Sequence, residues 1–308
     1  MARIKKGVPI HGWLVIDKPL GLSSSSVVGI VKRELNAQKA GHAGTLDPLA
    51  SGVLPIALGE ATKTVSFVMD GAKVYQFSVK WGEATNTDDA EGEVIQTSDI
   101  RPNLEEIEKA IPTFIGRINQ VPPAYSAIKI GGQRAYKLAR DGETVEMKPR
   151  EIEINDFRLI SSPDTSSATF EVFCQKGTYI RALARDLALK LGTYGHVTML
   201  RRTKSGPFVE KDAISLDSLG SLGHSARLET GLTPIETALD DIPALALTET
   251  EGGIMHQGGF VDLGPVLKQN PKHKVVEGEI VLASSNGKPV ALARTASNQL
   301  RPVRVFNL

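Results

Sequence analysis

Cysteine is almost missing from this sequence: Cys174 is the only one in 308 residues. A single thiol excludes a disulfide within one chain and a cluster of thiolate metal ligands. Cys174 alternates with Phe170 and Val172, and this strand-like pattern predicts a buried side chain that packs like a small apolar residue.

Long apolar runs are missing as well. None approaches the ~18 apolar residues that a membrane-spanning helix needs. The basic residues at the N-terminus are not followed by the apolar stretch that is typical of a secretory signal. We therefore expect a cytoplasmic protein with no membrane partner. A hydrophobic content of 41% with 23% charged residues is ordinary globular usage and excludes a disordered or fibrous chain.

Net charge is also small. The value of +1 excludes the strongly basic balance by which many nucleic-acid-binding proteins are recognised. Binding to RNA would therefore depend on local clusters of cations. The clusters available are Lys32, Arg33 and Lys39; Arg201, Arg202 and Lys204; and Arg3, Lys5 and Lys6. A solvated surface is the competing interpretation of each cluster, and charge alone favours it.

The segment from Gly41 to Gly52, GHAGTLDPLASG, surrounds Asp47 with residues too small to cover it. Its glycines allow backbone conformations and close approaches that a Cβ would block, and Pro48 biases Asp47 towards an extended backbone. This pattern predicts a stiff loop that presents one exposed carboxylate. An ordinary turn capped by the Asp47 side chain is the alternative, and the local pattern alone favours it.

The string continues through Val53–Lys63, and the whole resembles the signature of the TruB family of tRNA pseudouridine synthases. Further segments that resemble the motifs of this family follow along nearly the whole chain: Gly12–Ser24, Lys73–Tyr75, Pro122–Lys129, Lys176–Arg181, Leu200–Thr203 and Ser205–Phe208. The chain departs from the family at Ser25-Ser26, where members often carry His-Asp or Asn-Asp. A serine there still caps the following helix.

The resemblance implies an α+β fold with two domains. Residues 1–243 would form the catalytic domain, with a mixed, largely antiparallel sheet and an RNA-clamping thumb insertion at about residues 122–151. Residues 244–308 would form a small, β-rich, PUA-like RNA-binding domain, and this part carries seven Lys/Arg against five Asp/Glu.

Local patterns predict several elements of this fold directly. Residues 73–81 alternate like a strand that places Tyr75 on its apolar face. Asn103 followed by Glu106 resembles a capping box, and Pro112 should end the helix that it starts. Gly131-Gly132 suits a tight hairpin turn. The C-terminal part suggests strands at Leu245–Thr248, Gly258–Asp262, Lys274–Ser284, Pro289–Arg294 and Val303–Leu308.

Arg181 falls in the first turn of an expected helix whose apolar face runs from Ile180 to Leu191. The helix dipole disfavours a cation there by ~0.3–1 kcal/mol, so an anionic partner is expected. Asp186 or another surface acid is one candidate. The resemblance implies the other, Asp47, as the catalytic nucleophile, with Arg181 lowering its pKa and orienting it.

The remaining site residues come from the resemblance alone. Tyr75 corresponds to the position that stacks on the flipped base and assists the final deprotonation at C5. Tyr179 and Leu200 correspond to positions that line the uracil pocket, and His42 to one that enters the RNA loop. For His42, a hydrogen-bonded turn histidine is the alternative.

The implied activity is an isomerisation that converts uridine to pseudouridine at position 55 in the T-loop of tRNA, through base flipping and carboxylate catalysis. The implied partner is the tRNA T-arm, and we expect a monomer with no cofactor and no protein partner. A metal is not predicted, because the acidic segment Thr85–Gly92 lacks the ligand spacing of a calcium loop.

Three other functions compete with this one. A non-catalytic RNA-binding protein would not need the set Asp47, Tyr75 and Arg181. A nucleoside hydrolase would not need a thumb and a basic tail of RNA-binding size. A guide-RNA-dependent relative is the third alternative, and the thumb insertion favours an enzyme that selects its RNA without a guide.

Overall fold

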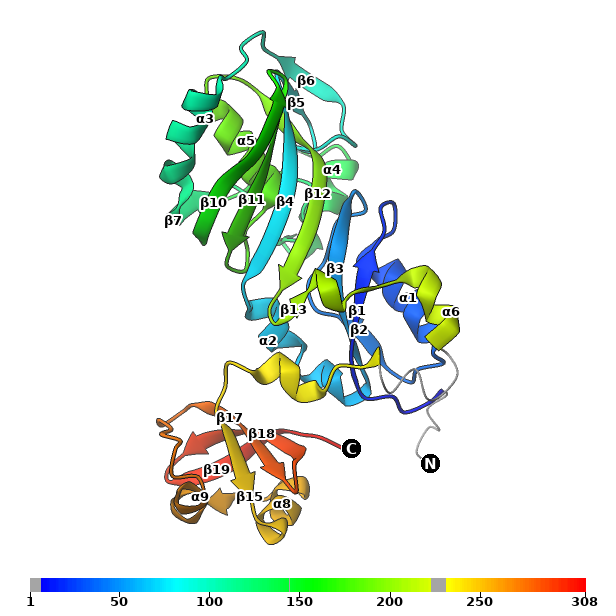
Figure 1. The fold of residues 1–308 in the computed structure, drawn as a ribbon, viewed down its shortest axis with the longest axis vertical. Helices are drawn as coiled ribbons and strands as arrows, with labels where there is room; N and C mark the ends of the chain where they lie inside the picture. Colours follow the sequence, from blue (N-terminus) through cyan, green and yellow to red (C-terminus); the bar gives the residue numbers. More distant parts are fainter. Residues whose placement is uncertain (1–6, 144, 223–230) are drawn as a thin grey trace.

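The computed structural model describes residues 7–143, 145–222 and 231–308. Its main elements are one large sheet and one smaller sheet, and the smaller sheet lies at the lower end of the view in Figure 1. The basic residues Arg3, Lys5 and Lys6 lie outside the described residues. Within the described ranges, no helix is both long and apolar enough to cross a membrane.

The large sheet has ten strands and is mixed. Only the pairs β1 with β14 and β3 with β12 are parallel, so the expectation of a largely antiparallel sheet in an α+β fold is confirmed. In spatial order its strands are β14 (Ile214–Ser215), β1 (Gly12–Lys18), β3 (Ala50–Leu58), β12 (Gly195–Ser205), β4 (Lys73–Trp81), β11 (Ser167–Cys174), β10 (Arg150–Asp164) and β7 (Gly116–Gln120), with β13 (Phe208–Val209) beside β12 and β2 (Ala40–His42) beside β3.

Strand β4 lies in the interior of this sheet, between β12 and β11, and has the predicted bounds. Phe77, Val79 and Trp81 are buried on one face, and Phe77 stacks on Phe170 of β11 with ring centroids 5.4 Å apart. Tyr75 continues this apolar face but is half-buried. The apolar stripe therefore ends where the candidate site begins.

Helices and short hairpins surround the large sheet. The helices are α1 (Ser24–Glu34), α2 (Val65–Asp70), α3 (Leu104–Ala110), α4 (Ala135–Arg140), α5 (Ile180–Lys190) and α6 (Leu219–Leu222), with 3₁₀ turns η1 (Gly59–Lys63), η2 (Ile111–Phe114), η3 (Glu210–Asp212), η4 (Leu216–Ser218) and η5 (Ile235–Leu239). The hairpins are β5 (Glu83–Thr85) with β6 (Val94–Thr97), and β8 (Lys129–Ile130) with β9 (Gln133–Arg134).

Both predicted helix starts are present, but the cap of the first is Ser23, because Ser25 and Ser26 lie inside α1. Ser23 caps α1 through a hydrogen bond from Ser26 N, and both halves of the Asn103/Glu106 capping box are formed at α3. The second helix also ends as predicted, because α3 stops at Ala110, before Pro112, and Pro112 lies in the first turn of η2. A proline is tolerated in a first helical turn, where its missing N–H has no partner to lose.

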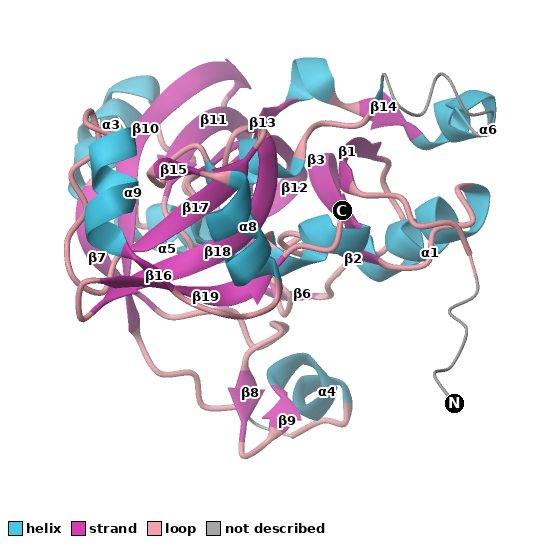
Figure 2. Cartoon of the chain, turned by 90° about the horizontal axis from the view of Figure 1, so that it is seen from below, coloured by secondary structure: helices cyan, strands magenta, loops and turns pink. Residues whose placement is uncertain are grey.

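The predicted glycine hairpin is formed. Gly131 and Gly132 link β8 to β9 with φ of +55° and +89°, and α4 follows directly. Hydrogen bonds from Tyr136 N to Ser126 O (3.0 Å) and from Ala135 N to Ile128 O (2.7 Å) close the unit on itself. Figure 2 shows β8, β9 and α4 projecting from the body of the molecule. These elements fall within the segment predicted to be a thumb.

The small sheet has five strands in the order β15 (Ala244–Leu247), β17 (Ile280–Ser285), β18 (Lys288–Ala296), β19 (Gln299–Val305) and β16 (Val261–Asp262). Two predicted strands are too long, because β16 starts at 261 and β17 starts at 280, and the predicted strand Val303–Leu308 is displaced, because β19 runs from Gln299 to Val305. Two helices, α8 (Glu249–His256) and α9 (Leu263–Gln269), were not predicted.

Both of these helices have sequences that argue against a helix locally. α8 contains Gly252 and Gly253, each costing ~1 kcal/mol relative to alanine, and α9 carries Pro265 in its first turn. A capping box formed by Thr248 and Glu251 starts α8, and Met255 packs into the core of the small sheet. Tertiary packing therefore outweighs the weak local preference.

An apolar cluster joins the two sheets. Leu282, Leu292 and Phe306 of the C-terminal part pack in one cluster with Trp13 and Phe208 of the large sheet. Burial of side chains of this size contributes ~1.5–3 kcal/mol each. The contact fixes the smaller sheet against the body that carries the site.

Candidate active site

Asp47 lies in the loop between β2 and β3, and its side chain is 39% exposed. The last residue of β1 and the residues that follow it hold this loop in place. Lys18 Nζ donates to Pro48 O (3.3 Å), Gly21 N donates to the same carbonyl (2.8 Å), and Leu46 N donates to Ser24 Oγ (2.8 Å). The predicted exposed carboxylate on a fixed loop is confirmed.

Glycine is required on both sides of Asp47. Gly44 and Gly52 have φ of +105° and +99°, where other residues are strained. A Cβ at Gly52 would also lie 2.2 Å from the backbone oxygen of Arg202. The loop therefore packs directly on the backbone of β12.

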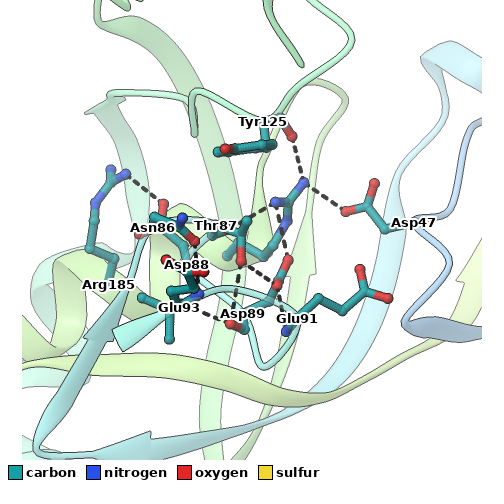
Figure 3. A network of polar contacts seen from close by, with 11 residues as sticks. Asp47, Asn86, Thr87, Asp88, Asp89, Glu91, Glu93, Tyr125 and Arg185 are labelled. Carbon is teal, nitrogen blue, oxygen red and sulfur yellow. Dashed lines mark hydrogen bonds and ion pairs between the residues drawn. The ribbon is translucent and has the colours of Figure 1, made fainter. Parts of the chain in front are cut away.

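Arg181 pairs with Asp47, and the side chain of Arg181 is only 7% exposed. Arg181 Nη2 lies 2.8 Å from Asp47 Oδ2, and Arg181 Nη1 lies 3.2 Å from Asp89 Oδ2. The same two nitrogens donate to the carbonyls of Thr87 and Tyr125, both at 2.9 Å. Figure 3 shows Asp47, Asp89 and Tyr125 arranged around this contact network. Arg181 thus has two anionic partners, Asp47 and Asp89, where one was expected.

Asp186, the alternative partner for Arg181, is engaged elsewhere. It pairs with Arg185 at 2.9 Å, and Arg185 also contacts Asp88 at 2.9 Å. Burial raises the pKa of Asp88, and the Arg185 guanidinium opposes that rise. The two arginines of α5 therefore bind separate sets of carboxylates.

Asp89 is a site residue that the sequence did not reveal. It is 2% exposed, and its Oδ1 accepts hydrogen bonds from Thr87 Oγ1 (2.5 Å) and Glu91 N (3.0 Å). The sequence of its segment raises only the question of a metal loop. No group of three or more His, Cys, Asp or Glu residues is placed to hold a metal within the described ranges. Nothing in the local spacing marks Asp89 as a partner of an arginine far along the chain.

A pocket of about 320 Å³ opens beside Asp47. The predicted site residues that line it are Asp47, Tyr75, Tyr179, Arg181 and Leu200. They come from separate elements, and the sheet brings them together, because β12 lies between β3 and β4. The volume suits one nucleoside rather than a stretch of RNA.

The aromatic walls of this pocket are held by the surrounding structure. Burial raises the pKa of the Tyr75 phenol, while the Arg202 guanidinium beside it acts in the opposite direction. The Tyr179 backbone is held at both ends by the Gln120 amide, which accepts from Tyr179 N (2.8 Å) and donates to Tyr179 O (3.1 Å). Burial raises the pKa of the Tyr179 phenol as well.

His42 does not line this pocket. It is half-buried on β2 opposite Ile56, and its Nδ1 is buried without a hydrogen-bond partner in the described part of the chain. Burial lowers the pKa of His42, and the nearby Arg202 charge lowers it further. The alternative of a hydrogen-bonded turn histidine is therefore wrong for Nδ1, and the role of His42 in RNA binding stays a prediction.

The basic cluster at residues 201–204 is not the free cationic surface that the sequence allowed. Arg202 is 1% exposed and points into the protein. Arg201 binds both oxygens of Asp17 at 3.0 Å and also Glu210 Oε1 at 2.5 Å. Arg202 is therefore not part of a cationic surface, whereas a phosphate contact by Arg201 stays a prediction.

A second pocket of about 700 Å³ lies against Asp47, Arg181 and Asp89. It is also lined by Ser23–Ser25, Asn86, Thr87, Glu91–Glu93, Tyr136 and Arg140. The Asp47–Arg181 pair therefore stands between a nucleoside-sized pocket and a wider space that reaches the expected thumb.

Comparisons with known proteins identify a family for this chain. Residues 32–180 match the model of the TruB family pseudouridylate synthase (N terminal domain), and residues 181–240 match that of the tRNA pseudouridylate synthase B C-terminal domain. Proteins named tRNA pseudouridine synthase B from Rhodospirillum rubrum and Caulobacter vibrioides are 53% and 51% identical, with all of both chains covered in each case.

Solved structures share the fold. The chain in "Crystal Structure of a Cbf5-Nop10-Gar1 Complex" has a TM-score of 0.73 at 26% identity, over 96% of this chain and 84% of that one. The chain in "Structure of H/ACA RNP bound to a substrate RNA containing 2'-deoxyuridine" has a TM-score of 0.74 at 23% identity, over 100% and 92%. The motifs, the pocket and above all the full-length relatives lead to one conclusion. This chain belongs to the TruB family of pseudouridylate synthases.

Proposed function

We propose that this protein converts uridine to pseudouridine in tRNA, at position 55 in the T-loop. The observation that carries the proposal is one exposed carboxylate, Asp47, held 2.8 Å from a buried arginine at the edge of a nucleoside-sized pocket. Relatives of equal length and about half-identical sequence bear the name tRNA pseudouridine synthase B.

The reaction needs a carboxylate that stays ionised. The enzyme breaks the bond between ribose C1′ and uracil N1, turns the base, and joins ribose to C5. Asp47 acts by forming and then releasing a covalent bond. The positive charge of Arg181 favours the ionised form of a neighbouring carboxylate, and its planar fork fixes the carboxylate's orientation.

The pocket residues receive a base that has left its stack. Flipping a nucleotide out of an RNA loop costs a few kcal/mol, and stacking on an aromatic ring repays ~1–3 kcal/mol. Tyr75 provides this ring, and its phenol assists the deprotonation at C5. Tyr179 and Leu200 enclose the base, and His42 enters the loop that the base leaves.

Recognition of the T-arm is assigned to the parts outside the pocket. The hairpin β8–β9 with α4 acts as the thumb at residues 122–151, and residues 244–308 act as a PUA-like domain that contacts phosphates. The protein works as a monomer in the cytoplasm. It needs no cofactor, because an isomerisation requires neither a redox group nor a phosphoryl donor.

Guide-RNA-dependent action is less well supported. The relatives named for tRNA are about twice as similar in sequence as the chain of the Cbf5-Nop10-Gar1 complex. The similarity to the relatives named for tRNA extends over the full length of both chains. In addition, the thumb elements give this chain an RNA contact of its own.

Incubation with an unmodified tRNA transcript tests the proposal. Chemical mapping should find pseudouridine at position 55, and a transcript with cytidine at that position should remain unmodified. Release of free uracil would indicate a hydrolase instead. Tight binding without any modified nucleotide would leave only an RNA-binding protein.

A further inference from the structure

Arg202 is a buried cation without a counter-ion. Its side chain is 1% exposed, yet no carboxylate lies within ion-pair distance in the described ranges, whereas Arg181 and Arg201 contact two carboxylates each. Arg202 Nε donates to Val53 O (2.8 Å) and Nη2 donates to Gly44 O (3.1 Å). Neutral donors would satisfy two carbonyls, so a structural role alone does not account for a buried charge whose desolvation costs several kcal/mol.

The position of this charge is specific. Arg202 lines the nucleoside-sized pocket and lies directly opposite Tyr75 in the register of β12 with β4. Lys73 lines the same pocket, and its ammonium is held by backbone carbonyls of Met69 and Gly71. Burial lowers the pKa of Lys73 to about 8, and the Arg202 charge is the next largest cause. Two buried cations therefore share one wall of the pocket.

Few chemical groups in or near the pocket can be the partner of the Arg202 charge. A phosphodiester keeps its water shell at the protein surface, and a guanidinium that is 1% exposed does not reach it there. Among the described residues, Asp47 is the one carboxylate that lines the pocket, and its ion-pair partner is Arg181 rather than Arg202. Apart from the neutral Tyr75 phenol beside it, what remains for Arg202 to contact in an occupied pocket is the base itself.

We propose that Arg202 stabilises the negative charge that develops on uracil when its bond to ribose breaks. This inference rests on the proposed function. Whichever atom Asp47 attacks, the electron pair of the C1′–N1 bond leaves with the ring and spreads onto its oxygens. The pair at C5 then forms the C1′–C5 bond, the bond to Asp47 breaks, C5 loses its proton and N1 gains one. A preorganised cation stabilises the charge of the first step, because its donors already point at the place where the charge develops.

A change of leaving group tests this role. Fluorine at C5 withdraws electrons and stabilises the uracil anion without help from the protein. Arg202→Gln should slow single-turnover cleavage of uridine in a T-arm RNA by about 100-fold or more. On the same RNA with 5-fluorouridine at the target, the loss should be much smaller, measured as disappearance of 5-fluorouridine after digestion to nucleosides. Arg202→Lys, which keeps the charge, should retain more activity than Arg202→Gln.

Two controls separate the outcomes. Arg201→Gln removes the neighbouring arginine on the outer side of β12 and should give a small loss that is equal on both RNAs. Circular dichroism and tRNA affinity establish that each variant is folded. If Arg202→Gln does not fold, the test uses Arg202→Lys, whose loss of cleavage rate must also be smaller on 5-fluorouridine than on uridine.

An equal loss on uridine and 5-fluorouridine would overturn the proposal and leave Arg202 as a brace for the Asp47 loop. A weaker affinity for RNA with an unchanged cleavage rate would also overturn it. Absence of pseudouridine with the unaltered protein would instead contradict the proposed function.

Discussion

Asp89 Oδ2 lies 3.2 Å from Arg181 Nη1 and fixes the arginine that also holds Asp47. The two carboxylates bind different nitrogens of one guanidinium and differ in exposure, 3% for the Asp89 side chain against 39% for that of Asp47. Asp89 is thus the buried anchor, and Asp47 is the group left open to a substrate. The arginine is oriented before any RNA arrives.

Asp89→Asn should keep the shape of this anchor but remove its charge. Arg181 then relies on two carbonyls, and a shift of the guanidinium would misplace Asp47. Because small misplacements of a reacting group cost up to ~10²-fold, we expect turnover to fall by about that factor while tRNA affinity is unchanged. Asp88→Asn, which changes the partner of Arg185 instead, is the matched control. Equal losses in both variants would contradict a specific link to Asp47.

Asp47→Asn should abolish turnover and leave tRNA binding intact, because the amide is nearly isosteric but a poor nucleophile. Pseudouridine is measured in the isolated tRNA, and affinity is measured by filter binding. Asp156→Asn, an exposed residue on β10, is the control for a surface carboxylate. More than trace amounts of pseudouridine from Asp47→Asn would refute its role as nucleophile.

Tyr75→Phe and Tyr75→Leu separate stacking from proton transfer. The phenylalanine keeps a ring worth ~1–3 kcal/mol of stacking against a non-aromatic side chain, so its RNA affinity should be close to that of the unaltered protein. We expect poor turnover in Tyr75→Phe and, in addition, weaker binding in Tyr75→Leu. If Tyr75→Phe turns over at the normal rate, the phenol has no part in proton transfer.

Gly52→Ala should destabilise the protein strongly. The new Cβ would meet the Arg202 backbone oxygen at 2.2 Å, in addition to the strain of a φ of +99°. Gly192→Ala is the matched control, since its φ is +74° but nothing lies within 4 Å of the new Cβ. Urea unfolding should show a loss of about 1–2 kcal/mol for the control and a clearly larger one for Gly52→Ala. Similar losses would mean that the loop does not pack tightly on β12.

The phosphate-contacting role of the C-terminal part is tested in the full-length protein, because truncation would expose Trp13 and Phe208 where Phe306 now packs. Lys268, Lys272 and Lys274 are exposed. Changing all three to Gln should weaken tRNA binding and flatten its dependence on salt, since each lost phosphate contact reduces the slope by about 0.7–0.9. Lys109→Gln on α3 is the control. An unchanged slope would remove these lysines from the RNA-binding surface.

Local patterns were enough for much of the fold. The alternation of residues 73–81, the Asn103/Glu106 cap and the Gly131-Gly132 turn predicted their elements because each depends on neighbours within a few residues. The helices α8 and α9 could not be predicted in this way. Glycines and a proline oppose them locally, and the core of the small sheet stabilises them through distant residues.

The same distinction applies to the site. The sequence by itself determined that Asp47 sits on a glycine-rich loop, because that outcome depends on adjacent residues. Only the tertiary structure decided which groups surround it. Asp89 and Arg202 reach the site through the order of strands in the sheet and the start of α5, and a burial or a charge pairing set by distant parts of the chain leaves no periodic trace in the sequence.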